Sequence, residues 1–185
     1  MKKYKAYGIG AALVDTEIKV EDRELDQMGV EKGLMTLVDQ ARQRELLGHL
    51  EGHLVKANHA SGGSAGNSMI ATAQFGGPTF MSCKVANDAD GDIYIADLEA
   101  AGVDHCWRGD RDDGITGKCL VMISPDAERS MNTYLGISET LSVDQLDAGA
   151  ITQSEYLYLE GYLVTSPTGR AAAVRAREVA EAAGV

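Results

Sequence analysis

Cysteine is scarce in this chain of 185 residues, and no two cysteines have the C-x-x-C spacing of a metal or redox site. Cys83, Cys106 and Cys119 are scattered along the sequence. An odd number of cysteines without metal spacing is typical of reduced, mostly buried thiols. This pattern argues against a disulfide framework and favours a protein of the cytoplasm.

Long apolar runs and positive charge are also lacking. No apolar run approaches membrane-spanning length, and the basic start, Met1 to Lys5, is not followed by the apolar core of a signal peptide. The 17 Lys and Arg residues against 28 Asp and Glu residues give a formal net charge of −11. We therefore expect neither nucleic acid nor an anionic membrane as a partner, and any anionic ligand needs a local positive site.

Two glycine motifs of nucleotide-binding proteins begin in this chain without being completed. Gly8-Ile9-Gly10 follows an apolar run, but Leu13 replaces the third glycine of the dinucleotide fingerprint and a strand-like pattern follows it. Gly117-Lys118-Cys119 resembles the end of a P-loop, but Asp112 stands at the leading glycine and Cys119 at the hydroxyl residue. We therefore expect phosphate binding at neither motif.

Calcium and zinc patterns are incomplete as well. Four positions of a calcium loop are met, by Asp88, Asp90, Gly91 and Asp97. The first ligand would be Ala86, and the bidentate Glu of the last position is missing, so an acidic cap at a helix start explains these residues better. His49 and His53 are spaced i, i+4 without a third ligand nearby, so they are expected to be solvated. We predict no metal site among the residues of this chain.

The spacing of apolar residues predicts one α/β domain. Strands are expected at 4–9, 13–20, 79–85 and 156–163. Helices are expected at 34–50, from the glycines at 62–66 to about Phe75, at 92–101 and at 167–183, and the charged residues 21–32 are expected to form a loop. Residues 114–124 and 129–135 predict two strands joined by a hairpin, which suggests a small sheet that stands off a mostly parallel one.

The most informative stretch is Gly62-Gly63-Ser64-Ala65-Gly66-Asn67, which opens an apolar helical segment. Glycine lets the backbone approach a ligand closely, and a helix N-terminus offers unpaired N–H groups. Such a junction can hold hydroxyls or anions. A local helix-start turn, with Asn67 as a cap, is the structural alternative.

The order of features around this stretch resembles the ribokinase-like (PfkB) sugar and nucleoside kinases, and most closely their adenosine-kinase branch. The resemblance spans essentially all 185 residues. Its elements are Asp15 five residues beyond Gly10, the 62–67 stretch, the turn 84–91, the pairs Thr116-Gly117 and Arg129-Ser130-Met131, and the strand Tyr156 to Tyr162. It implies an α/β fold, a ribokinase-like three-layer Rossmann-like core with a small projecting β-sheet lid, whose lid segments lie at about 13–35 and 114–136.

The resemblance also implies roles for single residues. Asp15, Gly62, Gly63 and Asn67 would hold sugar hydroxyls, and Arg129 would reach the ATP phosphates. Gln27 and Met131 align with positions near the nucleoside in that branch. Ala11 stands where adenosine kinases often have asparagine, which leaves the exact substrate open. The implied cofactors are ATP and Mg²⁺, and the implied partner is a small sugar or nucleoside.

The family's late D-T-x-G-A-G-D segment, which supplies the anion hole and the catalytic aspartate, has no counterpart in this sequence. The resemblance therefore implies the N-terminal portion of such a kinase and no catalytic residue within 1–185. A non-catalytic sugar- or nucleoside-binding module is the alternative, and a purely structural α/β domain is a third. An exposed edge of the lid would permit a homodimer through the lid.

Overall fold

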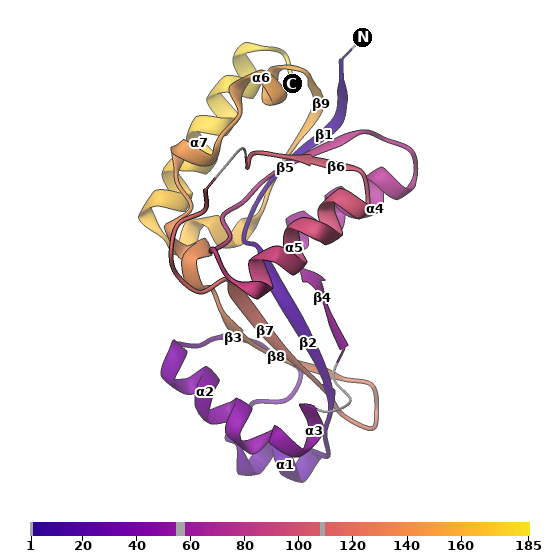
Figure 1. Cartoon of the computed structure of the whole chain (residues 1–185), viewed down its shortest axis with the longest axis vertical. Helices are drawn as coiled ribbons and strands as arrows, with labels where there is room; N and C mark the ends of the chain where they lie inside the picture. Colours follow the sequence, from indigo (N-terminus) through magenta and orange to yellow (C-terminus); the bar gives the residue numbers. More distant parts are fainter. Residues whose placement is uncertain (1, 55–57, 108–109) are drawn as a thin grey trace.

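The computed structural model of the chain describes residues 2–54, 58–107 and 110–185. Within these residues the strands form two sheets, one in each half of the molecule (Figure 1). The core sheet has the order β6-β5-β1-β9, and all of its pairings are parallel. Its strands are β1 (Tyr4–Ile9), β5 (Thr79–Ser82), β6 (Val103–His105) and β9 (Ser154–Leu159). Every residue of β5 is buried, as expected for a parallel strand covered on both faces.

Helices cover both faces of the core sheet, which makes three layers (Figure 1). One face carries α4 (Ser64–Gln74) and α5 (Ala89–Ala100), and the other carries α6 (Ala148–Thr152) and α7 (Pro167–Ala182). The short 3-10 helices η1 (Gly136–Thr140), η2 (Val143–Gln145) and η3 (Gly161–Thr165) connect these elements. None of the helices in the described part of the chain combines the length and the apolar content needed to cross a membrane.

Helix α7 shows how the sequence builds one of these layers. The Ser166 hydroxyl accepts a hydrogen bond from the Gly169 N–H at 3.0 Å, and Pro167 fills the first helical position, where a missing N–H costs nothing. Ala172, Ala176 and Ala180 are buried one turn apart, so that a stripe of small side chains lets the helix pack closely.

The second sheet, called here the lid sheet, has the order β3-β8-β7-β2-β4 and mixes parallel and antiparallel pairings. Its strands are β2 (Leu13–Lys19), β3 (Met35–Leu37), β4 (Asn58–Gly62), β7 (Gly117–Ile123) and β8 (Arg129–Tyr134). Helices α1 (Asp22–Gln27), α2 (Gln40–His49) and α3 (Glu51–Leu54) lie beyond this sheet, at the bottom of Figure 1. Ile18 and Met122 of the sheet pack with Leu25 and Leu46 of the helices in a second apolar core.

Several predicted elements are confirmed. The strand at 4–9, the hairpin formed by β7 and β8, and the final helix occur close to their expected positions. Asp88 caps α5 by accepting a hydrogen bond from the Gly91 N–H at 2.8 Å, which confirms the acidic helix cap. The fold predicted by the resemblance, a three-layer core with a projecting β-sheet lid, is confirmed.

Other expectations are wrong, and in each case a tertiary or capping interaction decides the structure. Residues 21–32 contain helix α1, because Glu21 and Glu24 form a capping box and Leu25 is buried against the lid sheet. The expected helix at 34–50 starts with strand β3, which pairs with β8, and α2 begins only after Asp39, whose side chain caps it. Helix α5 begins at Ala89 and not at residue 92, because Asp88 is its cap.

The strand boundaries also differ. Strand β5 ends at Ser82 instead of residue 85, and β9 ends at Leu159, where η3 replaces the expected strand to residue 163. Strand β4 lacks apolar alternation, and strand β6 has only three residues. Each is recognisable only by its pairing with a neighbouring strand. The lid sheet includes β3 and β4 in addition to strands from the 13–35 and 114–136 segments.

Candidate functional site

The carboxylate of Asp15 lies against the backbone of Gly62. Asp15 is in the middle of β2, on the face of the lid sheet that does not carry Ile18, because side chains alternate along a strand. In the register of β2 and β4, Leu13 is the direct partner of Gly62 and Asp15 is that of Ala60. A Cβ atom at position 62 would overlap the Asp15 carboxylate, so only glycine leaves room for it.

Gly63 and the start of α4 form the other side of the same site. Gly63 is the N-cap residue of α4 and has φ 87°, a left-handed value that glycine adopts without strain. A Cβ atom at position 63 would also lie 2.6 Å from the carbonyl oxygen of Ala11. Helix α4 therefore begins directly beside Asp15 and Gly62, and the Ser64 and Ala65 N–H groups of its first turn donate to the Glu160 carboxylate.

Asn67 lies one turn into α4, and its side chain is exposed to solvent. Its N–H donates to the Gly63 carbonyl at 3.0 Å, as part of the helix. The structure therefore places four of the predicted residues, Asp15, Gly62, Gly63 and Asn67, around one junction between the two sheets.

Glu160 was not predicted from the sequence, although it organises this junction. Its side chain is buried, with 4% of its surface exposed, just after β9. One carboxylate oxygen accepts the Ala11 N–H at 2.6 Å, and the other accepts the Ser64 N–H at 3.1 Å and the Ser64 hydroxyl at 2.6 Å. The only available signal was a charged residue directly after a core strand.

The pKa of Asp15 is raised to about 6. Burial is the main cause, because a low-polarity environment disfavours the charged carboxylate. The negative charge of Glu17 raises the pKa further, and the positive charge of Arg129 lowers it. These three side chains lie on one face of the lid sheet. Glu17 follows Asp15 by two residues on β2, and Val121 of β7 pairs with both Glu17 and Met131. Arg129 precedes Met131 by two residues on β8, so its side chain is on the same face.

Arg129 forms an ion pair at the surface of the lid sheet. Its guanidinium lies 2.9 Å from the Glu17 carboxylate, and 59% of its side chain is exposed. Met131 is half-buried on the same face of the sheet. Both residues are therefore on the Asp15 face, near the end of the hairpin.

Gln27 lies elsewhere in the structure. It is an exposed residue at the end of α1, the helix that packs Leu25 beneath the other face of the lid sheet. The structure does not bring Gln27 to the Asp15 junction in this conformation, and its assignment to the nucleoside stays a prediction.

The comparisons with known proteins decide the family. A model of the pfkB family of carbohydrate kinases matches residues 34–185. The chain belongs to the pfkB family. The resemblance stated from the sequence is thereby confirmed. No curated protein matched the chain.

Solved structures of two kinases superpose closely on the chain. Adenosine kinase from Sinorhizobium meliloti has 35% identity and a TM-score of 0.91, over 98% of this chain and 54% of that one. A probable sugar kinase from Rhizobium etli CFN 42 has 31% identity and a TM-score of 0.92, over 100% of this chain and 55% of that one. The chain thus spans about half the length of these structures.

A more distant similarity supports the fold alone. Adenosine kinase from Anopheles gambiae, solved in complex with P1,P4-di(adenosine-5) tetraphosphate, has 19% identity and a TM-score of 0.84, over 97% of this chain and 56% of that one. The pfkB-type fold is therefore retained at low sequence identity.

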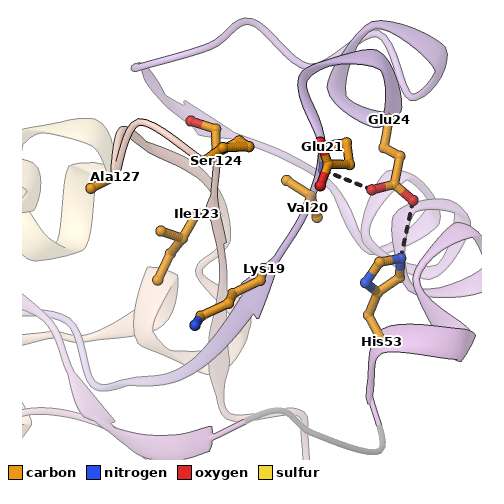
Figure 2. Close-up of a pocket in the computed structure, with 9 residues that line it drawn as sticks. Lys19, Val20, Glu21, Glu24, His53, Ile123, Ser124 and Ala127 are labelled. Carbon is orange, nitrogen blue, oxygen red and sulfur yellow. Dashed lines mark hydrogen bonds and ion pairs between the residues drawn. The ribbon is translucent and has the colours of Figure 1, made fainter.

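A separate cavity of about 410 Å³ lies at the outer end of β2 in this pfkB-family chain (Figure 2). His53 Nε2 lies 3.1 Å from Glu24, whose other carboxylate oxygen accepts the Glu21 N–H at 2.7 Å. Lys19 and Ile123 line the same cavity. Its walls carry both signs of charge and do not include Asp15 or Gly62. Among residues 2–54, 58–107 and 110–185, no group of three or more His, Cys, Asp or Glu side chains could hold a metal ion.

Proposed function

We propose that the natural protein carrying this chain transfers a phosphoryl group from ATP to a hydroxyl of a sugar or an adenosine-like nucleoside. In this proposal the chain supplies the hydroxyl-binding site and the lid. The observation that carries it is the Asp15 carboxylate against the bare backbone of Gly62, beside the start of α4. A carboxylate can accept hydrogen bonds from two hydroxyl groups in a fixed geometry, which suits a vicinal diol.

The residues around this junction divide the binding task. Asp15 accepts hydrogen bonds from the hydroxyl groups, and Gly62 and Gly63 let the substrate approach the backbone. The exposed Asn67 amide would contact a further hydroxyl. The apolar side chains on the Asp15 face, such as Met131, would cover the substrate and exclude water.

When bound, ATP would supply the phosphoryl group and Mg²⁺ would neutralise charge on its phosphate oxygens. Within the chain, Arg129 has the chemistry to pair with those oxygens, since a guanidinium forms a planar fork of donors. Its present partner is Glu17, so phosphate binding would exchange one anionic partner for another. No residue of this chain is assigned as the catalytic base.

The experiment is a substrate-dependent assay of ATP consumption by the natural protein with adenosine, ribose and fructose. Activity with one of these compounds, lost in Asp15→Asn and retained in Asp26→Asn, would support the proposal. Asp26 is an exposed aspartate on α1 and serves as the matched control. Binding of the compound without ATP consumption would favour the alternative, a non-catalytic sugar- or nucleoside-binding module.

We also propose that two copies pair through the outer edge of the lid sheet. Strand β3 is the last strand on one side of this sheet, and Leu34 and Leu37 beside that edge are 48% and 43% exposed. An open strand edge with apolar side chains is a template for pairing with another chain. A molar mass from light scattering equal to a dimer, reduced to a monomer by Leu37→Lys, is the expected result. A monomer for the unmodified protein at the same concentration would contradict it.

A further inference from the structure

The connection between the two sheets is a narrow neck packed with glycine. Within the described residues the chain passes between the sheets at β1–β2, β4–α4, the segment before β7, and β8–η1. A Cβ atom on Gly117 would lie 2.6 Å from the Ala12 carbonyl oxygen and 2.8 Å from that of Leu135. A Cβ atom on Gly63 would likewise overlap the Ala11 carbonyl oxygen, and one on Gly136 would overlap that of Ile115. The backbones of the crossing segments therefore lie close together, with the side chains of Leu13 and Ser138 also packed among them.

Hydrogen bonds between the core and the crossing segments help to set the orientation of the lid sheet. One buried set joins α5 of the core to Thr116, the residue before β7. One Asp88 carboxylate oxygen accepts the Thr116 hydroxyl at 2.6 Å, and the other accepts the Thr116 N–H at 2.9 Å. The Thr116 hydroxyl in turn accepts the Ala86 N–H at 3.0 Å. Thr116 has no exposed surface, so these bonds are protected from water.

Other contacts from the same helix lie on either side of this one. Asp90 forms an ion pair with Lys118, and Asp92 forms one with Arg111. In the last turn of α5, Asp97 accepts the Ser61 N–H at 2.9 Å and the Ser61 hydroxyl at 2.8 Å, which holds strand β4 of the lid sheet. Helix α5 thus holds the lid sheet at two of the crossings.

Asp88 is held in its charged form for this contact. Burial would raise the pKa of its carboxyl, but the hydrogen bonds from Thr116 and Gly91 outweigh burial and keep the pKa below its usual value. Asp88 therefore accepts hydrogen bonds at both oxygens at neutral pH.

We infer that Asp88 is a positioning residue for the substrate site and acts through Thr116 on the lid sheet. Strand β7 begins directly after Thr116 and pairs with β2 from Leu13–Gly117 to Lys19–Ile123, with Cys119 opposite Asp15. Asp15 and Gly62 belong to the lid sheet, whereas Gly63, Ser64 and Asn67 belong to the core at α4. Because Gly62 and Gly63 are adjacent in the chain, the Asp88–Thr116 contact acts on the orientation of Asp15 relative to the start of α4. This inference rests on the proposed function.

The variants that test it separate capping from positioning. Asp88→Ser keeps a side chain that can cap α5 but is too short to reach both Thr116 donors. Thr116→Val removes the hydroxyl at nearly constant volume, and Thr116→Ser restores it. Asp147→Asn changes a second helix-capping aspartate, whose carboxylate accepts the Ala150 N–H at 2.8 Å on the other face of the core sheet, and serves as the matched control.

The measurements are steady-state kinetics of the natural protein and hydrogen exchange of the β7 amides without ligand. We expect Asp88→Ser and Thr116→Val to raise KM for the hydroxyl substrate by about tenfold, with kcat changed less than about threefold. The β7 amides should exchange faster in both variants, while Thr116→Ser and Asp147→Asn stay near the unmodified protein. A role in folding alone would lower the active fraction, and hence kcat, without moving KM.

Unchanged KM and unchanged β7 exchange in Asp88→Ser and Thr116→Val would overturn the inference. If Thr116→Val fails to fold, Asp88→Ser decides between the same outcomes, because it retains the helix cap. If the natural protein consumes no ATP, the hydrogen-exchange comparison still tests the contact, and adenosine affinity by calorimetry replaces KM. Failure of the kinase assignment is therefore distinguishable from failure of the positioning role.

Discussion

The Asp15 carboxylate occupies the space that a side chain at position 62 would need, so Asp15 and Gly62 form one structural unit. These residues lie on neighbouring antiparallel strands of the lid sheet, and the core helix α4 begins two residues after Gly62. A hydroxyl bound by Asp15 would therefore contact the lid sheet and the core together.

Gly62→Ala should weaken substrate binding by at least about tenfold, because the added methyl group would displace the Asp15 carboxylate. Calorimetric titration with the substrate found in the activity assay measures this affinity. Gly48→Ala is the control, since a Cβ at this position in α2 meets nothing within 4 Å. Equal affinity in Gly62→Ala and the unmodified protein would show that Asp15 does not need its present position.

Substrate affinity should fall as the pH is lowered through about 6, where Asp15 takes up a proton. A protonated carboxyl can accept fewer hydrogen bonds from hydroxyl groups, so the dissociation constant should rise about tenfold per pH unit well below the pKa. Titrations between pH 5 and 8 check this, and Asp15→Asn should remove the dependence on Asp15. A dissociation constant that is constant over this range would contradict the assignment of Asp15.

The same raised pKa affects the stability of the folded chain. The pKa of Asp15 is about 6 in the folded chain and 3.8 for an unperturbed aspartate, so the unfolded chain releases this proton first as the pH rises. The free energy of unfolding therefore decreases as the pH rises between these two values, because the folded chain holds the Asp15 proton more tightly. Asp15→Asn should remove this decrease in urea unfolding measured at pH 4 and pH 7. An identical pH dependence in both proteins would argue that Asp15 is more solvated than its burial indicates.

Glu160→Gln should lower the free energy of unfolding by about 2 kcal/mol, because an amide cannot accept hydrogen bonds at both ends. Its NH₂ group would face the N–H of either Ala11 or Ser64, which both donate to Glu160. Urea unfolding followed by circular dichroism gives the value. Glu155→Gln is the matched control, because Glu155 pairs with Lys5 at the surface and exposed pairs contribute little.

Glu17→Gln should strengthen the binding of ATP by the natural protein, since it releases Arg129 from its present partner. The gain should not exceed about fivefold, because exposed ion pairs are worth at most about 1 kcal/mol. KM for ATP checks this, with Glu31→Gln as a control at an exposed glutamate of the lid. A KM that rises in Glu17→Gln and is unchanged in Arg129→Ala would indicate that Arg129 does not meet the phosphates.

The site was partly predictable, and its residues show why. Gly62, Gly63 and Asn67 lie within six consecutive residues, so the sequence alone indicated a glycine-rich helix start. Asp15 was recognisable only by its distance from Gly10 in a family pattern. Glu160 left almost no signal, because its partners Ala11 and Ser64 are 149 and 96 residues away along the chain.

Local chemistry determined those elements whose signals are close together in the chain. Ser166, Pro167 and the buried alanines define α7, and Gly184 with φ 67° follows its end. The hairpin of β7 and β8 likewise follows from adjacent strands and a turn. Only the tertiary structure decided that residues 35–37 and 58–62 are strands, that Glu160 joins two segments, and that Asp88 holds Thr116. These features depend on hydrogen-bond partners that folding brings together from distant parts of the chain, and no local periodicity records them.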